Sequence, residues 1–171
     1  MLGLKAGTVD LVPFHPEWHA LFLREKSILE DLVGASAVDI QHVGSTSIPH
    51  CWAKPIVDLA VGVKSPADAE SLIPVLVQAG YDFRGDAGVE GRLFFAKGPR
   101  DLRTHYLHVV VWGELLWNNQ IGFRDLLLLH PYLVLEYSRL KSALAQAFPE
   151  DRASYTQAKS AFIQEVLRGK Q

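Results

Sequence analysis

The stretch that decides the fold is HVGSTSIPHCWAKPIVDLAV, residues 42–61. It joins a Gly-Ser turn and several hydroxyl side chains to an apolar segment that contains one acid, Asp58. Glycine lets a backbone approach a ligand closely, and the amides and hydroxyls that follow can point at phosphate oxygens. The order is typical of a phosphate-binding loop that leads into a strand with a functional carboxylate. The Gly-Lys-Ser/Thr ending of a Walker loop is absent, and an ordinary turn is the alternative explanation.

The apolar part of this stretch alternates as a strand does. Val57, Leu59, Val61 and Val63 share one face, and Ile56, Asp58, Ala60 and Gly62 share the other. We expect the first face to lie in the core and the second, with its single charge, to be open to a ligand. Asp58 then binds a metal ion or forms an ion pair with Lys54 or an arginine. A second metal-binding acid would stand two residues further on, where the chain has Ala60.

Outward from this stretch, strand patterns cover residues 8–14, 38–43, 81–83, 92–97 and 104–112, besides 55–63. Helical patterns cover residues 16–33, 65–79, 115–129, 131–147 and 151–168. Strands and helices in this order predict an α+β domain with a mixed β-sheet and a helical C-terminal part.

The composition predicts one globular domain over residues 1–171. Hydrophobic residues make up 49% of the chain, and the formal net charge of -2 argues against binding nucleic acid by bulk charge. The only cysteine is Cys51, which favours a reducing compartment. We find no signal peptide and no apolar run long enough for a membrane span, so we expect a cytoplasmic protein; its oligomeric state stays open.

Two histidines lie in the predicted strand 104–112. Strand parity places His108 on one face, with Thr104 and Tyr106, and His105 on the other, so one of the two histidines can face a cleft while the other packs. The basic residues that could neutralise phosphate, or simply be solvated, are Lys54, Arg92, Lys97, Arg103 and Arg124.

In combination, the segments QHVGSTSIP, AKPIVDLAV, GRLFFAKG, RTHYLHVVV and FRDLLLLHP resemble the GrpB family, which is often placed in the nucleotidyltransferase superfamily. The resemblance runs in order along nearly the whole chain. It implies a nucleotidyltransferase-like fold, with a mixed β-sheet and packed helices. His50 stands where the family usually has glycine, and Ala60 lacks the second acid of active superfamily members.

The resemblance implies a nucleotidyltransferase-like protein that binds a nucleotide or another phosphate-containing ligand. Asp58 and His108 are then the catalytic residues and the ligands of a divalent metal, Mg or Mn. The phosphate-binding residues are Gly44, Ser45, Thr46, Ser47, Lys54, Arg92, Arg103 and His105.

Two other functions stay open. One Asp and one His make a poor Mg²⁺ site, so the chain can also be a non-catalytic binder of a nucleotide or phosphometabolite. Similar domains resemble segments fused to coenzyme A biosynthetic kinases, which implies an accessory domain, chaperone-like or regulatory, that acts with such an enzyme.

Overall fold

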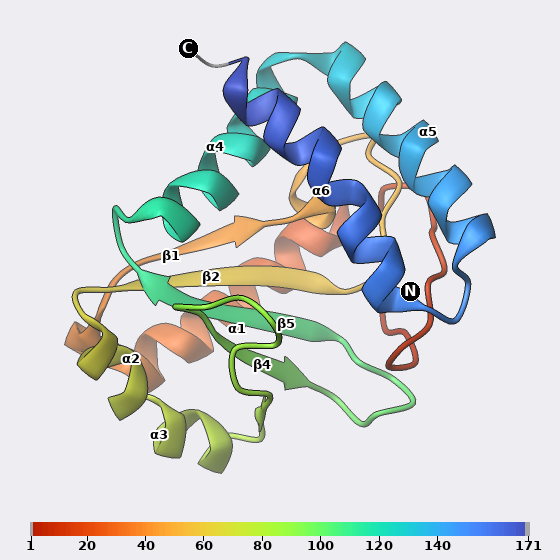
Figure 1. Ribbon diagram of the computed structural model, residues 1–171. Helices are drawn as coiled ribbons and strands as arrows, with labels where there is room; N and C mark the ends of the chain where they lie inside the picture. The colour runs from red at the N-terminus through yellow and green to blue at the C-terminus, as the bar shows by residue number, and fades with distance from the viewer. Residues whose placement is uncertain (1, 170–171) are drawn as a thin grey trace.

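A five-stranded sheet in the order β1-β2-β5-β4-β3 organises the molecule, a computed structural model that describes residues 2–169 (Figure 1). The strands are β1 (Ala37–Val43), β2 (Val57–Val63), β3 (Asp82–Phe83), β4 (Leu93–Lys97) and β5 (His105–Val111). Strands β2 and β5 run parallel, and all other neighbours are antiparallel. The predicted α+β class with a mixed sheet is confirmed.

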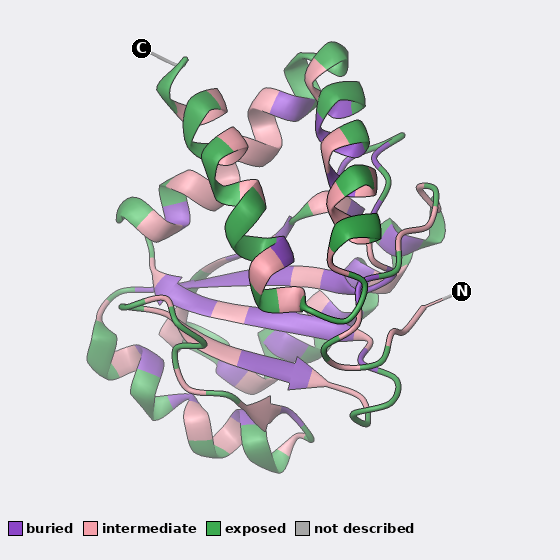
Figure 2. Ribbon diagram, turned by 45° about the vertical axis from the view of Figure 1, so that its right-hand side comes forward, coloured by how far each residue is buried: buried purple, intermediate pink, exposed green. Residues whose placement is uncertain are grey.

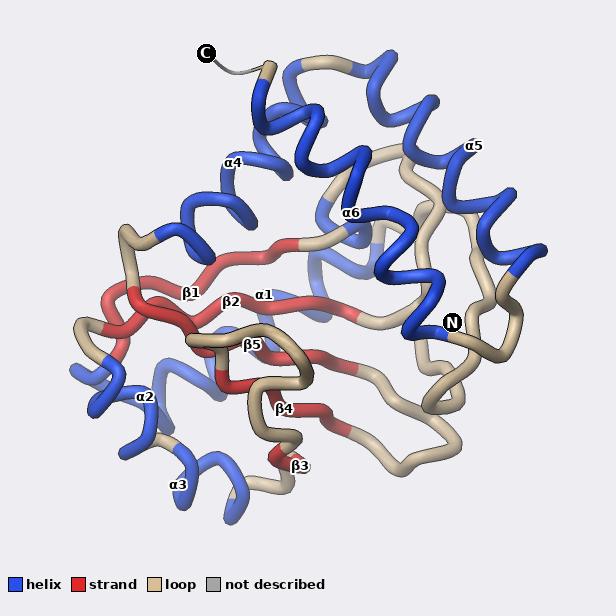
Figure 3. The backbone as a smooth tube through the Cα atoms, in the orientation of Figure 1, coloured by secondary structure: helices blue, strands red, loops and turns tan. Residues whose placement is uncertain are grey.

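The helices form two groups on opposite faces of this sheet. Helices α1 (Glu17–Val33), α2 (Pro66–Ser71) and α3 (Ile73–Gln78) share the main core with one face. Helices α4 (Leu115–Leu129), α5 (Pro131–Ala147) and α6 (Arg152–Arg168) form the helical C-terminal part on the other side (Figures 1 and 3). Within residues 2–169, none of these helices combines the length and the apolar character that a membrane span needs.

The two faces of β2 differ as the sequence alternation predicts. Its four valine and leucine side chains are fully buried in the main core, and Figure 2 shows the central strands almost entirely buried. On the opposite face, Ala60 packs with Trp117 of α4, and a side chain at Gly62 would collide with Trp112, which follows β5, and crowd Trp117. The two tryptophans therefore cover this end of the face, and Asp58 is the only residue of β2 that is not buried.

Two predicted elements differ from the structure. The strand predicted over residues 8–14 is wrong: this segment makes only an isolated bridge, between Val12 and Ala53, and Pro13 interrupts any longer ladder. The single helix predicted over residues 65–79 is divided at Leu72 into α2 and α3. The division follows from Pro74, which has no N–H to donate to a carbonyl of the preceding turn.

Candidate phosphate-binding site

The loop after β1 is held in a conformation that only glycine adopts readily. Gly44 has φ +68° and ψ -175°, a backbone region closed to most L-residues. The carbonyl oxygen of Gly44 accepts hydrogen bonds from the backbone amide of Ser47 at 3.2 Å and from the Ser47 hydroxyl at 2.6 Å. A Cβ atom on Gly44 would lie 2.8 Å from Oδ2 of Asp58. The loop therefore folds back directly against the carboxylate.

Asp58 and His108 meet across the parallel strands β2 and β5. The register pairs Asp58 with Tyr106 and Ala60 with His108, so His108 stands beside the residue that replaces the second acid. His108 Nε2 lies 3.1 Å from Asp58 Oδ1, and its Nδ1 lies 3.4 Å from Nη1 of Arg92. A guanidinium can only donate, so Nδ1 accepts this contact and Nε2 carries the hydrogen that is donated to Asp58.

The charge of Asp58 depends on these neighbours. Burial opposes ionisation, but the hydrogen bond and charge of His108, followed by the charges of Lys54 and Arg152, outweigh it and hold the pKa of Asp58 below its usual value. Asp58 is therefore a carboxylate at neutral pH and accepts, but does not donate, hydrogen bonds.

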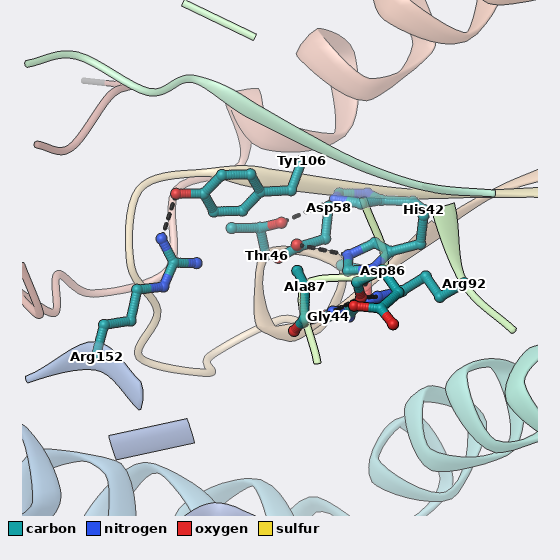
Figure 4. Close-up of polar contacts among 11 residues, drawn as sticks. His42, Gly44, Thr46, Asp58, Asp86, Ala87, Arg92, Tyr106 and Arg152 are labelled. Atoms are coloured by element: carbon teal, nitrogen blue, oxygen red, sulfur yellow. Dashed lines mark hydrogen bonds and ion pairs between the residues drawn. The ribbon is translucent and has the colours of Figure 1, made fainter. Parts of the chain in front are cut away.

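Arg92 is fixed by the loop that precedes β4. Its guanidinium donates to the carbonyl oxygens of Asp86 at 3.0 and 3.1 Å and of Ala87 at 3.1 Å (Figure 4). It also lies over the ring of Phe94. Residues 84–92 cross over the sheet on the same side as α6 (Figure 3). Arg92 thereby anchors the loop beside His108 and adds a positive charge next to Asp58.

These residues line a cavity of about 820 Å³ between the sheet, the loop 84–92 and helices α5 and α6. Its lining includes eight basic residues and, within the described part of the chain, a single carboxylate, that of Asp58. The basic residues are Lys54, Arg84, Arg92, Arg100, Arg103, Lys141, Arg152 and Lys159. A lining with this charge attracts anions strongly.

Most residues predicted from the sequence lie at this cavity: Gly44, Ser45, Thr46, Lys54, Asp58, Arg92, Arg103 and His108. Two of them already use their polar groups within the protein. The Thr46 hydroxyl lies 3.0 Å from Nε2 of His42, and burial lowers the pKa of His42 to about 4. The Arg103 guanidinium pairs with Asp82 and donates to the Gly98 carbonyl at 2.6 Å. Thr46 and Arg103 therefore support the site more than they offer contacts to a ligand.

Two predicted phosphate-binding residues do not line the cavity. His105 lies on the opposite face of β5, as strand parity requires, close enough to Glu25 and Lys97 for their charges to act on it. Its assignment to phosphate therefore does not fit its position. The Ser47 hydroxyl is engaged by Gly44 and helps to form the turn. Arg124 is also elsewhere: it donates to the side chain of Gln41 at 2.8 Å and joins α4 to β1.

The sequence interpretation missed five basic residues of the cavity: Arg84, Arg100, Lys141, Arg152 and Lys159. For the last three, which lie on α5 and α6, the helical spacing contains a signal. Lys141 occupies a position of the buried stripe of α5, which also contains Val134, Tyr137 and Ser138. Arg152 and Lys159 share one face of α6 with its only buried residue, Tyr155. A lysine within a buried stripe points to a polar or anionic partner.

The side chains of the cavity do not fit a resident divalent cation. Within residues 2–169, no three His, Cys, Asp or Glu side chains come together as a metal-binding group. Mg²⁺ prefers several oxygen ligands, whereas the lining offers one carboxylate, and its Oδ1 already faces His108. A Mg or Mn ion at Asp58 and His108 would have to arrive together with the phosphates of a ligand.

The chain is similar to proteins of one family along nearly all of its length. Residues 8–169 match the family described as GrpB protein. The Glutamate-rich protein GrpB of Alkalihalophilus pseudofirmus is 42% identical over 172 residues, which cover 98% of each chain. The crystal structure of conserved protein GrpB from Enterococcus faecalis has a TM-score of 0.84 at 30% identity and covers 94% of this chain and 96% of that one.

A longer protein contains a similar region. A dephospho-CoA kinase of Mycolicibacterium paratuberculosis is 27% identical over 188 residues, which cover 94% of this chain but only 45% of the kinase. The family match and the shared fold extend over almost all of residues 2–169, and on these grounds the chain belongs to the GrpB family.

Proposed function

We propose that this protein binds a nucleotide or another phosphate-containing small molecule in the cavity above Asp58, without a metal ion of its own. One observation carries the proposal: eight basic residues and a single carboxylate line the cavity, although the formal net charge of the chain is -2. Concentrating positive charge around one concave site favours a compact polyanion.

The shape of the site supports the same proposal. A volume of about 820 Å³ lies within the range of small-molecule sites, roughly 300–1,000 Å³. The loop that begins at Gly44 lines one wall and offers the Ser45 hydroxyl, which accepts a hydrogen bond from Lys141 at 2.8 Å and can turn to a phosphate oxygen. Aromatic rings of Tyr106 and Tyr155 line the cavity near these charges.

The charge of Asp58 gives a test by calorimetry. In buffer with a chelator, Asp58→Asn is expected to bind ATP or UTP about three- to tenfold more tightly than the wild type, because the only negative charge of the cavity is removed. If the ligand instead carries a cation to Asp58, the same variant binds less tightly than the wild type once Mg²⁺ or Mn²⁺ is added.

The matched control is Asp31→Asn, which removes the same charge from an exposed position on α1, outside the cavity. Its affinity should equal that of the wild type. If neither nucleotide binds to the wild-type protein in either buffer, the proposal is wrong.

Nucleotidyl transfer is a second candidate, favoured by the contact between Asp58 and His108 beside the Gly44 loop. In such a step an acceptor hydroxyl attacks the α-phosphorus, the bond to pyrophosphate breaks, and the hydroxyl proton passes to a base. His108 can act as that base only after Nδ1 is released from Arg92, because Nε2 already carries the hydrogen that it donates to Asp58. Release of pyrophosphate by the wild type, lost in Asp58→Asn, would establish transfer over simple binding.

An accessory role beside a coenzyme A biosynthetic enzyme is a third candidate, favoured by an apolar surface. A groove of about 500 Å³ lies between α5 and the loop 48–52, and Trp52, Leu128 and Leu135 are 43%, 48% and 54% exposed along it. The similarity to a dephospho-CoA kinase supplies the kind of partner.

Size-exclusion chromatography of a mixture with a dephospho-CoA kinase checks this role. We expect co-elution of the two wild-type proteins and its loss in Leu135→Glu, which places a charge in the groove. Separate elution of the wild-type proteins at micromolar concentration contradicts the role.

A further inference from the structure

Four of the basic residues gather at one end of the cavity and are named here the cationic cluster: Lys54, Lys141, Arg152 and Lys159. They come from three separate parts of the chain, the loop before β2, helix α5 and helix α6. In Figure 4 the Arg152 guanidinium points toward the hydroxyl of Tyr106 on β5, which accepts its hydrogen bond. The fold therefore brings like charges together from distant segments.

The partners of the cationic cluster are neutral. Lys54 and Lys159 lie over the ring of Tyr155, with Nζ 5.4 and 4.5 Å from its centre, and Lys141 lies 4.3 Å from the centre of the Tyr137 ring. Lys141 also donates to the Ser45 hydroxyl, to the carbonyl of Trp52 and, at 3.2 Å, to Sγ of Cys51. Within residues 2–169, no carboxylate lies within ion-pair distance of any of the four basic groups.

Such an arrangement is unfavourable unless an anion joins it. Lys141 is only 1% exposed, and a buried cation without a negative partner destabilises the folded state. Burial and the neighbouring cations lower the pKa of Lys159 to about 7 and also lower the pKa of Lys54. An apolar side chain would pack better than a lysine at the buried position 141, and the other three half-buried charges surround it, so the charges are suited to an anionic ligand.

We infer that the cationic cluster binds two or more linked phosphate groups, the di- or triphosphate part of the ligand, while the Gly44–Asp58–His108 end of the cavity holds the remainder. This inference rests on the proposed function and adds the class of ligand to it. A bound anion favours the protonated form of each lysine and so restores the full charge of the cationic cluster. A single phosphate carries about -1.5 to -2 charges near pH 7, which would neutralise only about half of these four groups. Inorganic polyphosphate and nucleoside triphosphates share the required chemistry.

Calorimetry in chelator-treated buffer tests the inference with orthophosphate, pyrophosphate, tripolyphosphate, AMP, ATP, UMP and UTP as probes. We expect affinity to rise at least about tenfold from orthophosphate to tripolyphosphate, since each added phosphate group makes further charge-assisted hydrogen bonds with the cationic cluster. Lys159→Gln and Arg152→Gln should each lower the affinity for tripolyphosphate about tenfold and change that for orthophosphate much less. Lys159→Arg should retain most of the affinity.

The control is Lys64→Gln, which removes the same charge from an exposed residue outside the cavity and should leave every affinity unchanged. Circular dichroism and thermal unfolding establish that the two cluster variants are folded. The ratio of the affinities for tripolyphosphate and orthophosphate separates a binding role of these side chains from a structural one. A loss of packing would weaken the binding of both ligands by the same factor.

The outcomes distinguish this inference from the proposed function. If mono- and triphosphates bind equally well, the inference is overturned and the proposed function stands. If tripolyphosphate binds but neither nucleotides nor other small phosphate compounds do, the cluster is a polyphosphate site and the proposed function fails in its nucleotide form. If no phosphate compound binds, both are overturned.

Discussion

Gly44→Ala is expected to lower the free energy of unfolding by about 2–5 kcal/mol and to abolish ligand binding in the cavity. Two effects add. The backbone at φ +68° and ψ -175° becomes strained for any residue with a Cβ, and this Cβ would lie 2.8 Å from Oδ2 and 3.1 Å from Cβ of Asp58. Either the loop or the carboxylate must move. Chemical denaturation and nucleotide calorimetry measure the two losses.

Gly113→Ala is the matched control for Gly44→Ala. Gly113 also has a positive φ, +78°, but nothing lies within 4 Å of a Cβ placed there. The variant Gly113→Ala therefore introduces backbone strain without a collision, and its free energy of unfolding should fall by only about 1 kcal/mol. In an Asp58→Ala background, Gly44→Ala should be less destabilising than in the wild type, because the nearest atom is gone. Equal losses in the two backgrounds would show that Asp58 is not the obstacle.

Glu25→Ala is expected to lower the free energy of unfolding by about 3–5 kcal/mol, through the opposite face of the sheet. Glu25, on α1, is 4% exposed; it accepts two hydrogen bonds from Lys97 Nζ, at 2.6 and 2.9 Å, and another from the Tyr81 hydroxyl. Removing the carboxylate leaves the partly buried ammonium and the buried hydroxyl without their acceptor. Chemical denaturation at pH 7 measures the loss.

Two further variants identify the cause of the Glu25 effect. Glu30→Ala, which removes an exposed acid paired with Lys26 on the same helix, should change stability by less than about 0.5 kcal/mol. Replacing Glu25 by Leu and Lys97 by Met in one variant should recover much of the stability that Glu25→Ala loses, because no unpaired charge remains. A double variant as unstable as Glu25→Ala would contradict this explanation.

The pH dependence of the Glu25 effect has a definite sign. Burial opposes the charge of Glu25, but its hydrogen bonds to Lys97 and Tyr81 and the nearby charges outweigh burial and lower its pKa. The folded state therefore binds this proton less readily than the unfolded state, and the stabilisation is present above the unfolded pKa of about 4.5 and lost as pH falls below it. The difference between the wild type and Glu25→Ala should shrink on acidification.

Much of the fold and part of the site could be predicted from local sequence. Strand alternation separates Asp58 from the core face of residues 55–63 and His108 from His105 within residues 104–112, because side chains alternate strictly along a strand. The pairing of β2 with β5 then places His108 on the face of Asp58. The family resemblance nevertheless assigns His105 to phosphate. The structure therefore favours the physical pattern over the transferred assignment at this position.

The rest of the site depends on tertiary packing that local patterns do not encode. Lys141, Arg152 and Lys159 reach the cavity because α5 and α6 cross the open end of the sheet, and helix periodicity fixes a face but not the direction in which it packs. The same limit explains why the sequence predicts an open face at Ala60 and Gly62: only the tertiary structure shows that Trp117 covers Ala60 and that Trp112 and Trp117 cover Gly62.

Helix α6 has a consequence for the cooperativity of folding. Tyr155 is its only buried residue, and two of the groups that face the sheet, Arg152 and Lys159, repel the other cations there. The second half of α6 packs Phe162, Ile163 and Val166 with α4 and α5, but the first half buries only Tyr155. This first half therefore belongs to the low-stability end of the protein, where segments open locally before the molecule unfolds. A bound anion would turn the repulsion into attraction and tie α6 to β5 and α5. The ligand would thus stabilise the tertiary structure as well as bind to it, and the first half of α6 would open locally less often.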